Sequence, residues 1–392
     1  MTGKRYRLVL YDTSDFEGFP IGGQLTSIRN FLRYVALGHG VPAEEILLVG
    51  VTTDPEGPGR LRQIDLGGKR FDFFPVLSRN RDLSGAEGSL RAAYLKGLCR
   101  YHRQLPGGKQ VIHYLHTPEA FLYLTAFRPF CRTAVFSHGS FFNLAAGFRF
   151  YRSCPLVGPL CGGFVRFLLR RADLIFTLDR ISTEQYRPYS RNVVQVENSV
   201  VLPEPREKQA HDPLRLLYAG RLSGVKQVDG ILRAMPDRVR LTVAGDGEER
   251  DALLALTAEL RLEDRVTFLG AVDPAQMDRL LEEHDILVMN SALEGKPMAI
   301  IEALAHGLPV IAPPVGGIPE MLCSGSDSVL TGAEGLPEAV EQIAGDYDAF
   351  SRRARQAAGR YDYRRVNGQI LSALQKLAEG SGPAAFLPEE EA

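Results

Sequence analysis

The sequence lacks the features of a disulfide-stapled or membrane-spanning protein. It has five cysteines, an odd number, and none of them form a C-x-x-C pair. Free thiols in a reducing compartment are therefore expected. No apolar run reaches the roughly 18 residues that a membrane span requires, and the longest candidate, 154–165, is interrupted by glycine and proline. The N-terminal residues run directly into a strand-like apolar stretch, so we expect no signal peptide and a cytoplasmic protein.

Acidic residues are absent from 120–172, although this stretch contains seven arginines. The arginines are interleaved with aromatic residues, among them Phe141, Phe142, Phe148, Phe150, Tyr151, Phe164 and Phe167. Two interpretations remain open. The aromatic residues belong to the core and the arginines to a solvated face, or the stretch forms a basic aromatic surface that attracts an anionic membrane or an anionic lipid-linked substrate. Nucleic acid is not expected as a partner, because no nucleic-acid-binding module is visible.

The net charge of −1 hides an asymmetry between the two halves of the chain. Residues 1–203 carry 26 Lys and Arg against 16 Asp and Glu, and the remainder carries 20 against 31. The basic half contains the acid-free stretch, so an anionic membrane or an anionic lipid-linked acceptor is expected to meet that half.

Apolar strand-like runs alternate with amphipathic helical patterns along the whole chain, which predicts an α/β fold with parallel sheets covered by helices. The length suggests two doubly wound, Rossmann-like domains. We place the first at 1–203 and the second at 204–379, because the alternation restarts near residue 214 after the polar segment 203–213. The tail, residues 380–392, is small, polar and acidic, and we expect it to be disordered.

The most informative stretch is DILVMNSALEGKPMAIIEALAHGLP, residues 285–309. A buried strand at 286–289 is followed by a loop that contains Glu294 and then by a helix that opens at Pro297 and ends at Gly307. Glu302 lies seven residues beyond that loop glutamate, inside the helix. In an open parallel sheet ligands bind at the carboxyl ends of the strands. Carboxylates placed there can accept hydrogen bonds from sugar and ribose hydroxyls, which suits a nucleotide-sugar.

A second pattern, LLYAGRLSGVKQVDGIL, lies at residues 216–232. It places Gly220, Arg221 and Lys226 in the loop after another buried strand. Two cations at the carboxyl edge of the same sheet can neutralise a diphosphate leaving group as its charge develops.

Together the two patterns resemble those of the retaining family-4 glycosyltransferases. The first matches the E-x7-E signature in the form EG-x-P-x4-EA-x3-G-x-P, and the second matches the family's glycine, arginine and lysine at the same spacing. The resemblance implies the GT-B architecture, two Rossmann-like domains facing across a cleft, with the acceptor bound by the first domain and the nucleotide-sugar by the second. It also implies that the last helix packs back on the first domain.

For the donor site, the resemblance implies that Glu294 holds the donor sugar and Glu302 the ribose, while Arg221 and Lys226 bind the diphosphate. The amides of Met298, Ala299 and Ile300, in the first turn of the helix, are further candidates for the diphosphate. Gly220 and Gly245 are expected in the donor site, the latter in a G-x-G turn near the base, and the turn with Gly316, Gly317 and Glu320 is expected to close the nucleotide site. Lys296 departs from the family pattern. It either adds a contact to the donor or points to water, and we favour the second.

In the first domain the resemblance implies roles for Gly22, Gly23 and His138. The glycine pair allows a phosphate or acceptor to approach the backbone closely, and His138 is a catalytic candidate beside the donor sugar. His113 and His116 are spaced one residue wider than the family's H-x-H, so we assign them a structural or acceptor-side role. A metal site at these histidines is not expected, because no fourth ligand is evident.

The resemblance therefore implies a metal-independent, retaining hexosyltransferase with no cofactor. Its donor is expected to be a UDP-sugar, and its acceptor a lipid-linked or polysaccharide-precursor glycan at the inner face of the membrane. Two alternatives remain. One is a GT-B epimerase of the nucleotide-sugar, which lacks the E-x7-E arrangement, and the other is a nucleotide-sugar-binding module without catalysis.

Overall fold

The computed structural model describes residues 5–17, 23–79, 89–139, 141 and 157–380, with no account of the side chains of 157–161. Gly22, the aromatic and arginine residues between 142 and 156, and the predicted tail beyond Gly380 lie outside the described residues. The chain divides into two compact units, residues 1–197 with 364–392, and residues 198–363. The boundary between the two units precedes Pro203, the last residue of the predicted first domain. Val200 belongs to the second unit because it exchanges backbone hydrogen bonds with Tyr361 and Tyr363.

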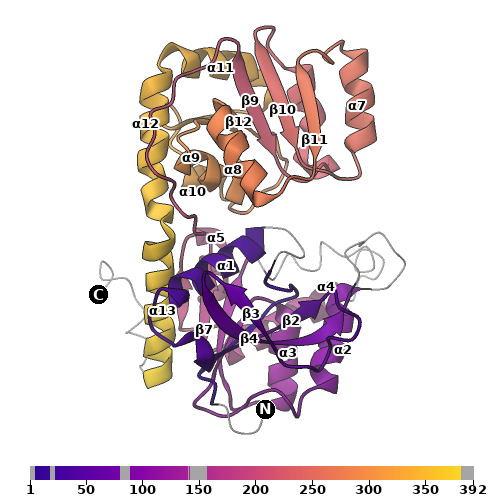
Figure 1. The fold of residues 1–392 in the computed structure, drawn as a ribbon, viewed down its shortest axis with the longest axis vertical. Helices are drawn as coiled ribbons and strands as arrows, with labels where there is room; N and C mark the ends of the chain where they lie inside the picture. Colours follow the sequence, from indigo (N-terminus) through magenta and orange to yellow (C-terminus); the bar gives the residue numbers. More distant parts are fainter. Residues whose placement is uncertain (1–4, 18–22, 80–88, 140, 142–156, 381–392) are drawn as a thin grey trace. The chain divides into compact units, whose positions relative to one another are not determined.

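The first unit contains an eight-stranded sheet in the order β3-β4-β2-β1-β5-β6-β7-β8 (Figure 1). Its strands are β1 (Leu8–Tyr11), β2 (Ile46–Thr52), β3 (Arg62–Leu66), β4 (Lys69–Ser78), β5 (Ile112–Leu115), β6 (Arg132–Ser137), β7 (Leu174–Thr177) and β8 (Val193–Gln195). Its helices are α1 (Gly23–Ala36), α2 (Leu90–Arg100), α3 (Pro118–Phe127), α4 (Val157–Arg171), α5 (Arg180–Tyr186) and α13 (Tyr363–Glu379).

Helices cover both faces of this sheet. Leu8 and Leu10 of β1 pack in a core with α1 and α13, whereas Val9 and Tyr11 pack in a second core with α2 and α3. Burial on both faces is the reason that these parallel strands read as continuous apolar runs. Helix α13, near the end of the chain, packs into the first unit through Val366, Ile370 and other apolar residues.

The hairpin β3–β4 is antiparallel and was missed by the sequence interpretation, which predicted only parallel strands. Gly67 and Gly68 join the two strands with φ values of 62° and 77°. Two consecutive glycines at positive φ are typical of a tight hairpin turn. The pattern was therefore readable from the sequence.

The second unit contains a six-stranded sheet in the order β11-β10-β9-β12-β13-β14, and every strand pairing in it is parallel. Its strands are β9 (Leu214–Ala219), β10 (Val239–Ala244), β11 (Val266–Gly270), β12 (Ile286–Val288), β13 (Val310–Ala312) and β14 (Ser328–Leu330). Its helices are α6 (Val228–Arg233), α7 (Arg250–Glu259), α8 (Pro274–Glu283), α9 (Met298–Ala305), α10 (Ile318–Met321), α11 (Leu336–Gly345) and α12 (Tyr347–Ala358).

Strand β9 shows how this sheet is buried. Leu216 and Tyr218 face a core with α6, α7 and α11, and Leu217 and Ala219 face a core with α8, α9 and α12. The adjacent strands β9 and β12 occupy the middle of the sheet. The loops that follow these two strands, which carry the predicted donor residues, therefore leave the sheet side by side.

No described helix combines the length and the apolar character needed to cross a bilayer. The described cysteines, Cys99, Cys131 and Cys323, are free thiols.

Candidate active site

Lys226 and Glu294 meet at the carboxyl edge of the second sheet. Lys226 ends a short 3₁₀ turn after β9, and Glu294 lies in the loop between β12 and α9. The Nζ atom of Lys226 donates to Oε1 of Glu294 at 2.5 Å, and the Ser291 hydroxyl donates to the same oxygen at 2.6 Å. The glutamate side chain is 8% exposed and the lysine side chain 24%. Both residues lie at the carboxyl edge of the sheet, where the sequence placed them. Their direct pairing could not be read from the sequence.

Arg221 is also paired with a carboxylate. Its Nη2 and Nε atoms donate to Oε2 of Glu248 at 3.0 and 3.3 Å, and both side chains are largely exposed. Glu248 belongs to the G-x-G turn, and its contact with Arg221 was not predicted. Because an exposed ion pair is screened by solvent and contributes little, an incoming diphosphate can compete with Glu248 for the guanidinium.

Two glycine turns pack closely on the loops that carry Gly220 and Glu294. A Cβ atom on Gly245 would lie 1.8 Å from the carbonyl oxygen of Gly220, and one on Gly316 would lie 1.8 Å from that of Glu294. Real side chains never reach such distances, so both positions require glycine. Gly317 adds a hydrogen bond from its amide to the oxygen of Gly295 at 3.1 Å. The 316–317 turn thereby packs on the backbone of the Glu294 loop.

Lys296 is buried, and the prediction that it points to water is wrong. Its side chain is 2% exposed, and its Nζ atom lies 3.3 Å from Oε2 of Glu320 on α10. The carbonyl oxygen of Lys296 accepts a hydrogen bond from the Asn198 side chain at 2.9 Å. The lysine therefore ties the Glu294 loop to α10.

Glu302 lies on α9, partly buried among apolar neighbours. Burial, with a smaller contribution from the Asp278 carboxylate, raises the pKa of Glu302 to about 7. Among the described residues no hydrogen bond or ion pair reaches its carboxylate. A carboxylate of this kind gains most from hydroxyl donors that a ligand supplies.

The first turn of α9 differs in one respect from the prediction. Pro297 is the N-cap, and the Ile300 amide donates to its carbonyl oxygen at 3.2 Å. The amides of Met298 and Ala299 are therefore better placed than that of Ile300 to meet a diphosphate.

In the first unit, buried His116 and half-buried His138 form a pair after the adjacent strands β5 and β6. Nδ1 of His116 and Nε2 of His138 lie 2.8 Å apart, so one ring donates and the other accepts. Burial lowers the pKa of His138 to about 3 and that of His116 well below its ordinary value. Both imidazoles are therefore neutral near pH 7. His116, to which the sequence assigned a structural or acceptor-side role, orients the catalytic candidate His138.

Asp12 was missed by the sequence interpretation, although it directly follows β1, the strand next to β5. The Gln24 amide nitrogen donates to Oδ1 of Asp12 and, at 3.2 Å, to the carbonyl oxygen of His116. Burial raises the pKa of Asp12 to about 6. Gly23 is the exposed first residue of α1, one position before this glutamine. The carboxyl edge of the first sheet thus carries several hydrogen-bonding groups suited to sugar hydroxyls.

His113, by contrast, serves the core. It is fully buried on β5, and its Nδ1 atom lies 3.0 Å from the Tyr11 hydroxyl. Within the described ranges, no group of three or more His, Cys, Asp or Glu side chains could hold a metal ion.

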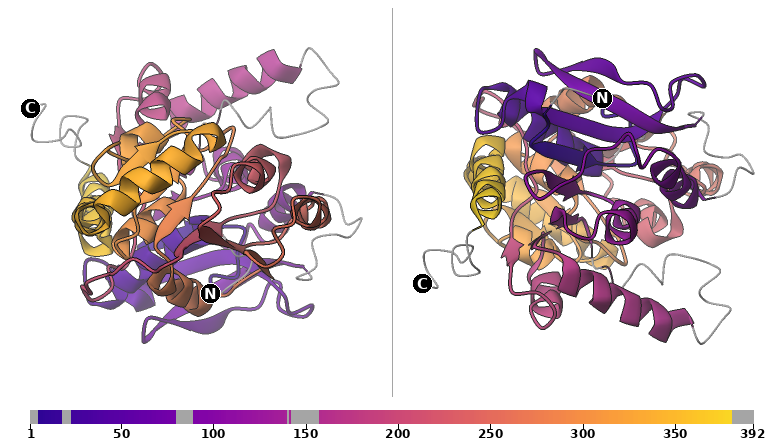
Figure 2. Two further views of the ribbon diagram at one scale, coloured as in Figure 1. Left: turned by 90° about the horizontal axis from the view of Figure 1, so that it is seen from above. Right: turned by 90° about the horizontal axis from the view of Figure 1, so that it is seen from below.

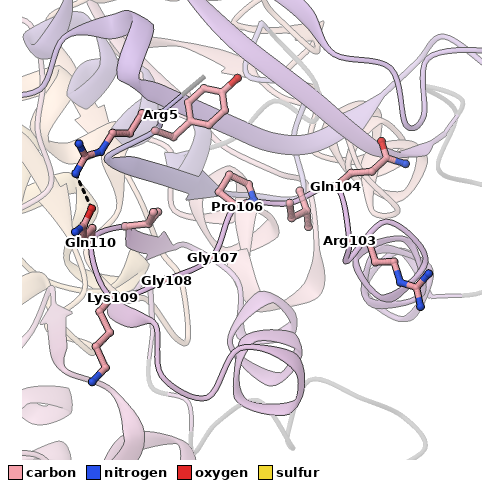
Figure 3. Close-up of a pocket in the computed structure, with 11 residues that line it drawn as sticks. Arg5, Arg103, Gln104, Pro106, Gly107, Gly108, Lys109 and Gln110 are labelled. Carbon is pink, nitrogen blue, oxygen red and sulfur yellow. Dashed lines mark hydrogen bonds between the residues drawn. The ribbon is translucent and has the colours of Figure 1, made fainter. Parts of the chain in front are cut away.

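Two cavities lie elsewhere, at the edges where strands begin. One, of about 680 Å³, is lined by residues that precede β1 and β5, and the other, of about 530 Å³, by residues at the start of β9 and β10. Figure 3 shows the first of them: Arg5 bonds Gln110, while Arg103 and Lys109 point in different directions. None of the predicted site residues lines either cavity.

Comparison with known proteins bears on the second unit. The family model described as glycosyl transferases group 1 matches residues 203–359. The matched segment covers most of the second unit. The match contains both sequence patterns, the Lys226–Glu294 pair and Glu302.

Curated relatives agree with this family. Glycogen synthase of Mycobacterium tuberculosis is 29% identical over 211 residues, which is 50% of this chain and 51% of that protein. N-acetyl-alpha-D-glucosaminyl L-malate synthase of Bacillus anthracis is 34% identical over 120 residues, 29% of this chain and 31% of that protein. The chain thus spans about half the length of the first relative and about a third of the length of the second.

Solved structures establish the fold of the whole chain. Sucrose-phosphate synthase of Thermosynechococcus elongatus superposes with a TM-score of 0.75 at 17% identity, covering 96% of this chain and all of the other. Anabaena HepE in complex with UDP-glucose gives 0.66 at 17% identity, covering 94% and 99%. With the two parallel-sheet units, these neighbours confirm the predicted GT-B fold.

Proposed function

We propose that this protein is a retaining glycosyltransferase of family 4. It moves a sugar from a nucleotide-diphospho-sugar, with a UDP-sugar as the donor, to a hydroxyl group of an acceptor glycan. The observation that carries the proposal is the Lys226–Glu294 pair at the carboxyl edge of the second sheet, inside the matched domain. One relative superposed on this chain contains UDP-glucose, which supports the choice of donor.

The second unit supplies the groups that a nucleotide-sugar needs. The Lys226 ammonium has three N–H donors, so it can keep Glu294 and still bind a phosphate oxygen. Arg221 leaves Glu248 for the same diphosphate, and the Met298 and Ala299 amides add backbone donors. Glu302 accepts hydrogen bonds from the ribose diol, and Glu294 from the sugar.

The chemical step is a substitution at the anomeric carbon. The bond from that carbon to the phosphate oxygen breaks, and the bond to the acceptor oxygen forms. The acceptor attacks the face from which the diphosphate leaves, within an ion pair, and its hydroxyl proton passes to the departing phosphate oxygen. Stabilisation of the developing phosphate charge is the main contribution of the protein, and we infer that Arg221 and Lys226 provide it without a metal ion.

The acceptor belongs to the first unit in this proposal. Neutral His138, oriented by His116, offers a ring nitrogen, and Asp12 and Gln24 offer oxygen acceptors for hydroxyl groups. We propose a lipid-linked or polysaccharide-precursor glycan, met at the cytoplasmic face of a membrane.

A donor panel tests the function. The protein is incubated with UDP-, GDP- and ADP-sugars, and release of the nucleoside diphosphate is scored together with transfer of the radiolabelled sugar. Transfer with an unchanged anomeric configuration, determined by NMR, is the expected result. Conversion of the donor into its epimer, or tight binding without turnover, would instead support one of the two alternatives and end this proposal.

A further inference from the structure

Exposed phenylalanines gather in one segment of the first unit. Among the described residues, the phenylalanines that are more than a third exposed are Phe127, Phe130, Phe164 and Phe167, at 43, 78, 40 and 49%. All lie within the stretch 120–172, which has no acidic residue. Large aromatic side chains are normally buried, so a cluster of exposed ones indicates an interaction surface.

Helix α4 carries two of them on a face that is turned away from the core. Val165, Leu168 and Leu169 are buried and form the inner face of the helix. Phe164 and Phe167, three residues apart, form one outer stripe, and exposed Arg166 and Arg170, four residues apart, form another beside it. Both views of Figure 2 show α4, in pink, at the periphery of the molecule's first unit.

The other two phenylalanines lie next to the end of this helix. Arg171 continues the aromatic stripe of α4, four residues after Phe167, and its guanidinium donates to the carbonyl oxygen of Pro129 at 3.0 Å. Pro129 directly precedes Phe130, and Phe127 ends α3, which contacts α4. The α4 stripe and the 127–130 corner are therefore neighbours. We call the four phenylalanines with Arg166, Arg170 and Arg171 the basic aromatic surface.

We propose that the basic aromatic surface docks this protein onto an anionic phospholipid bilayer. Aromatic rings occupy the interface between headgroups and acyl chains, and guanidinium groups beside them pair with lipid phosphates. The complete absence of acidic residues from 120–172 gives the charge complementarity that selects an anionic bilayer over a neutral one. The proposal concerns the first unit alone, so it does not depend on the donor residues of the second.

Tryptophan fluorescence tests this surface directly, because the native chain contains no tryptophan. Phe130→Trp and Phe167→Trp each place one reporter on the surface, and Leu254→Trp places one at the exposed Leu254 of α7 in the second unit. With vesicles of phosphatidylcholine and phosphatidylglycerol, emission from the first two variants should shift to the blue while that of Leu254→Trp stays unchanged. Unshifted emission from both surface reporters, or an equal shift in all three variants, overturns the proposal.

Co-sedimentation measures the energetics. The unmodified chain should bind phosphatidylglycerol-containing vesicles at low salt, release them at high salt, and ignore pure phosphatidylcholine. Arg166→Gln with Arg170→Gln should weaken binding by about 25-fold, at roughly fivefold for each basic side chain. Phe164→Ser with Phe167→Ser should also weaken it at least about tenfold, whereas Leu254→Ser with Leu269→Ser should not.

Release of the nucleoside diphosphate by each variant in detergent-free solution separates this proposal from the function. Variants that lose vesicle binding but keep donor turnover confirm the surface. If the unmodified chain does not bind the vesicles while its turnover is normal, the docking proposal fails and the transferase proposal stands. Salt-insensitive binding equal for both lipids would also overturn it.

Discussion

Lys226 and Glu294 neutralise each other at the carboxyl edge of the second sheet, with 2.5 Å between the ammonium nitrogen and the carboxylate oxygen. The lysine comes from the loop after β9 and the glutamate from the loop after β12, and these strands are neighbours in the sheet. A site prepared for a diphosphate and a polyol would otherwise hold unpaired charges. Under the proposed function, the pair keeps both groups in position until the donor brings its own phosphate oxygens and hydroxyl groups.

Lys226→Ala should reduce turnover at least ~100-fold, because it removes a preorganised positive charge from the leaving diphosphate. Glu302→Ala should have an effect of similar size. Steady-state release of the nucleoside diphosphate provides the measurement. Arg233→Ala, an exposed change on α6 in the same unit, is the control and should be silent. Near-normal rates in both site variants would remove these residues from the active site.

Donor binding should strengthen as pH rises through about 7, the raised pKa of Glu302. The ionised carboxylate accepts hydrogen bonds from the ribose diol, and the protonated form loses part of that capacity. KM for the donor should therefore fall between about pH 6 and about pH 8, and Glu302→Gln should abolish this trend. A KM that is flat with pH in the unmodified enzyme would contradict the ribose role.

The same pKa has the opposite consequence for stability. The folded state holds the Glu302 proton more tightly than the unfolded chain does, so this group stabilises the fold fully below its ordinary pKa of 4.5 and loses that contribution as pH rises to about 7. Urea unfolding of the Glu302→Gln variant should lack this part of the pH dependence.

His138 should remain neutral across the physiological range, because burial lowers its pKa to about 3. Nitrogen NMR of histidine-labelled protein should show no titration of this ring between about pH 5 and about pH 8. Its contribution to stability is complete above the ordinary pKa of 6.5 and is lost as pH falls toward about 3, since the unfolded chain then binds the proton first. Titration near neutrality would rule out the neutral pair with His116.

The second unit should lose more stability when Glu320 alone loses its charge than when both members of the Lys296–Glu320 ion pair lose theirs. Glu320→Gln leaves a buried ammonium without its charged partner, and we expect destabilisation of about 1–3 kcal/mol, discounted because Glu320 is 29% exposed. Adding Lys296→Met should recover part of this loss. Urea midpoints of the transition that reports the second unit supply the comparison, and additive effects of the two changes would show that the ion pair is unimportant.

Activity should survive an excess of chelator. Arg221, Lys226 and the first amides of α9 already offer positive charge and donors to a diphosphate. The chelator assay should be followed by addition of magnesium or manganese. Complete loss of activity that either ion restores would mean that a metal holds the leaving group.

The sequence alone determined the two-sheet architecture and the edge at which the donor residues lie. Buried parallel strands are nearly all apolar, so β9 is readable as the apolar run Leu214–Ala219, and the Asp273 capping box followed by Pro274 marks the start of α8. The motif spacing also placed Lys226 and Glu294 on loops at one edge. Local pattern is sufficient for these features because each depends on residues that are close together in the chain.

Tertiary structure alone decided which side chains meet and which are buried. Lys296, predicted to point to water, is covered and paired with Glu320, a residue on a different element. Phe164 and Phe167, equally compatible with a core, are exposed because the other face of α4 packs on the sheet. Partners from distant segments, and the burial that shifts the pKa of Glu302 or His138, arise only when the strands are brought together, and no local pattern in the sequence encodes them.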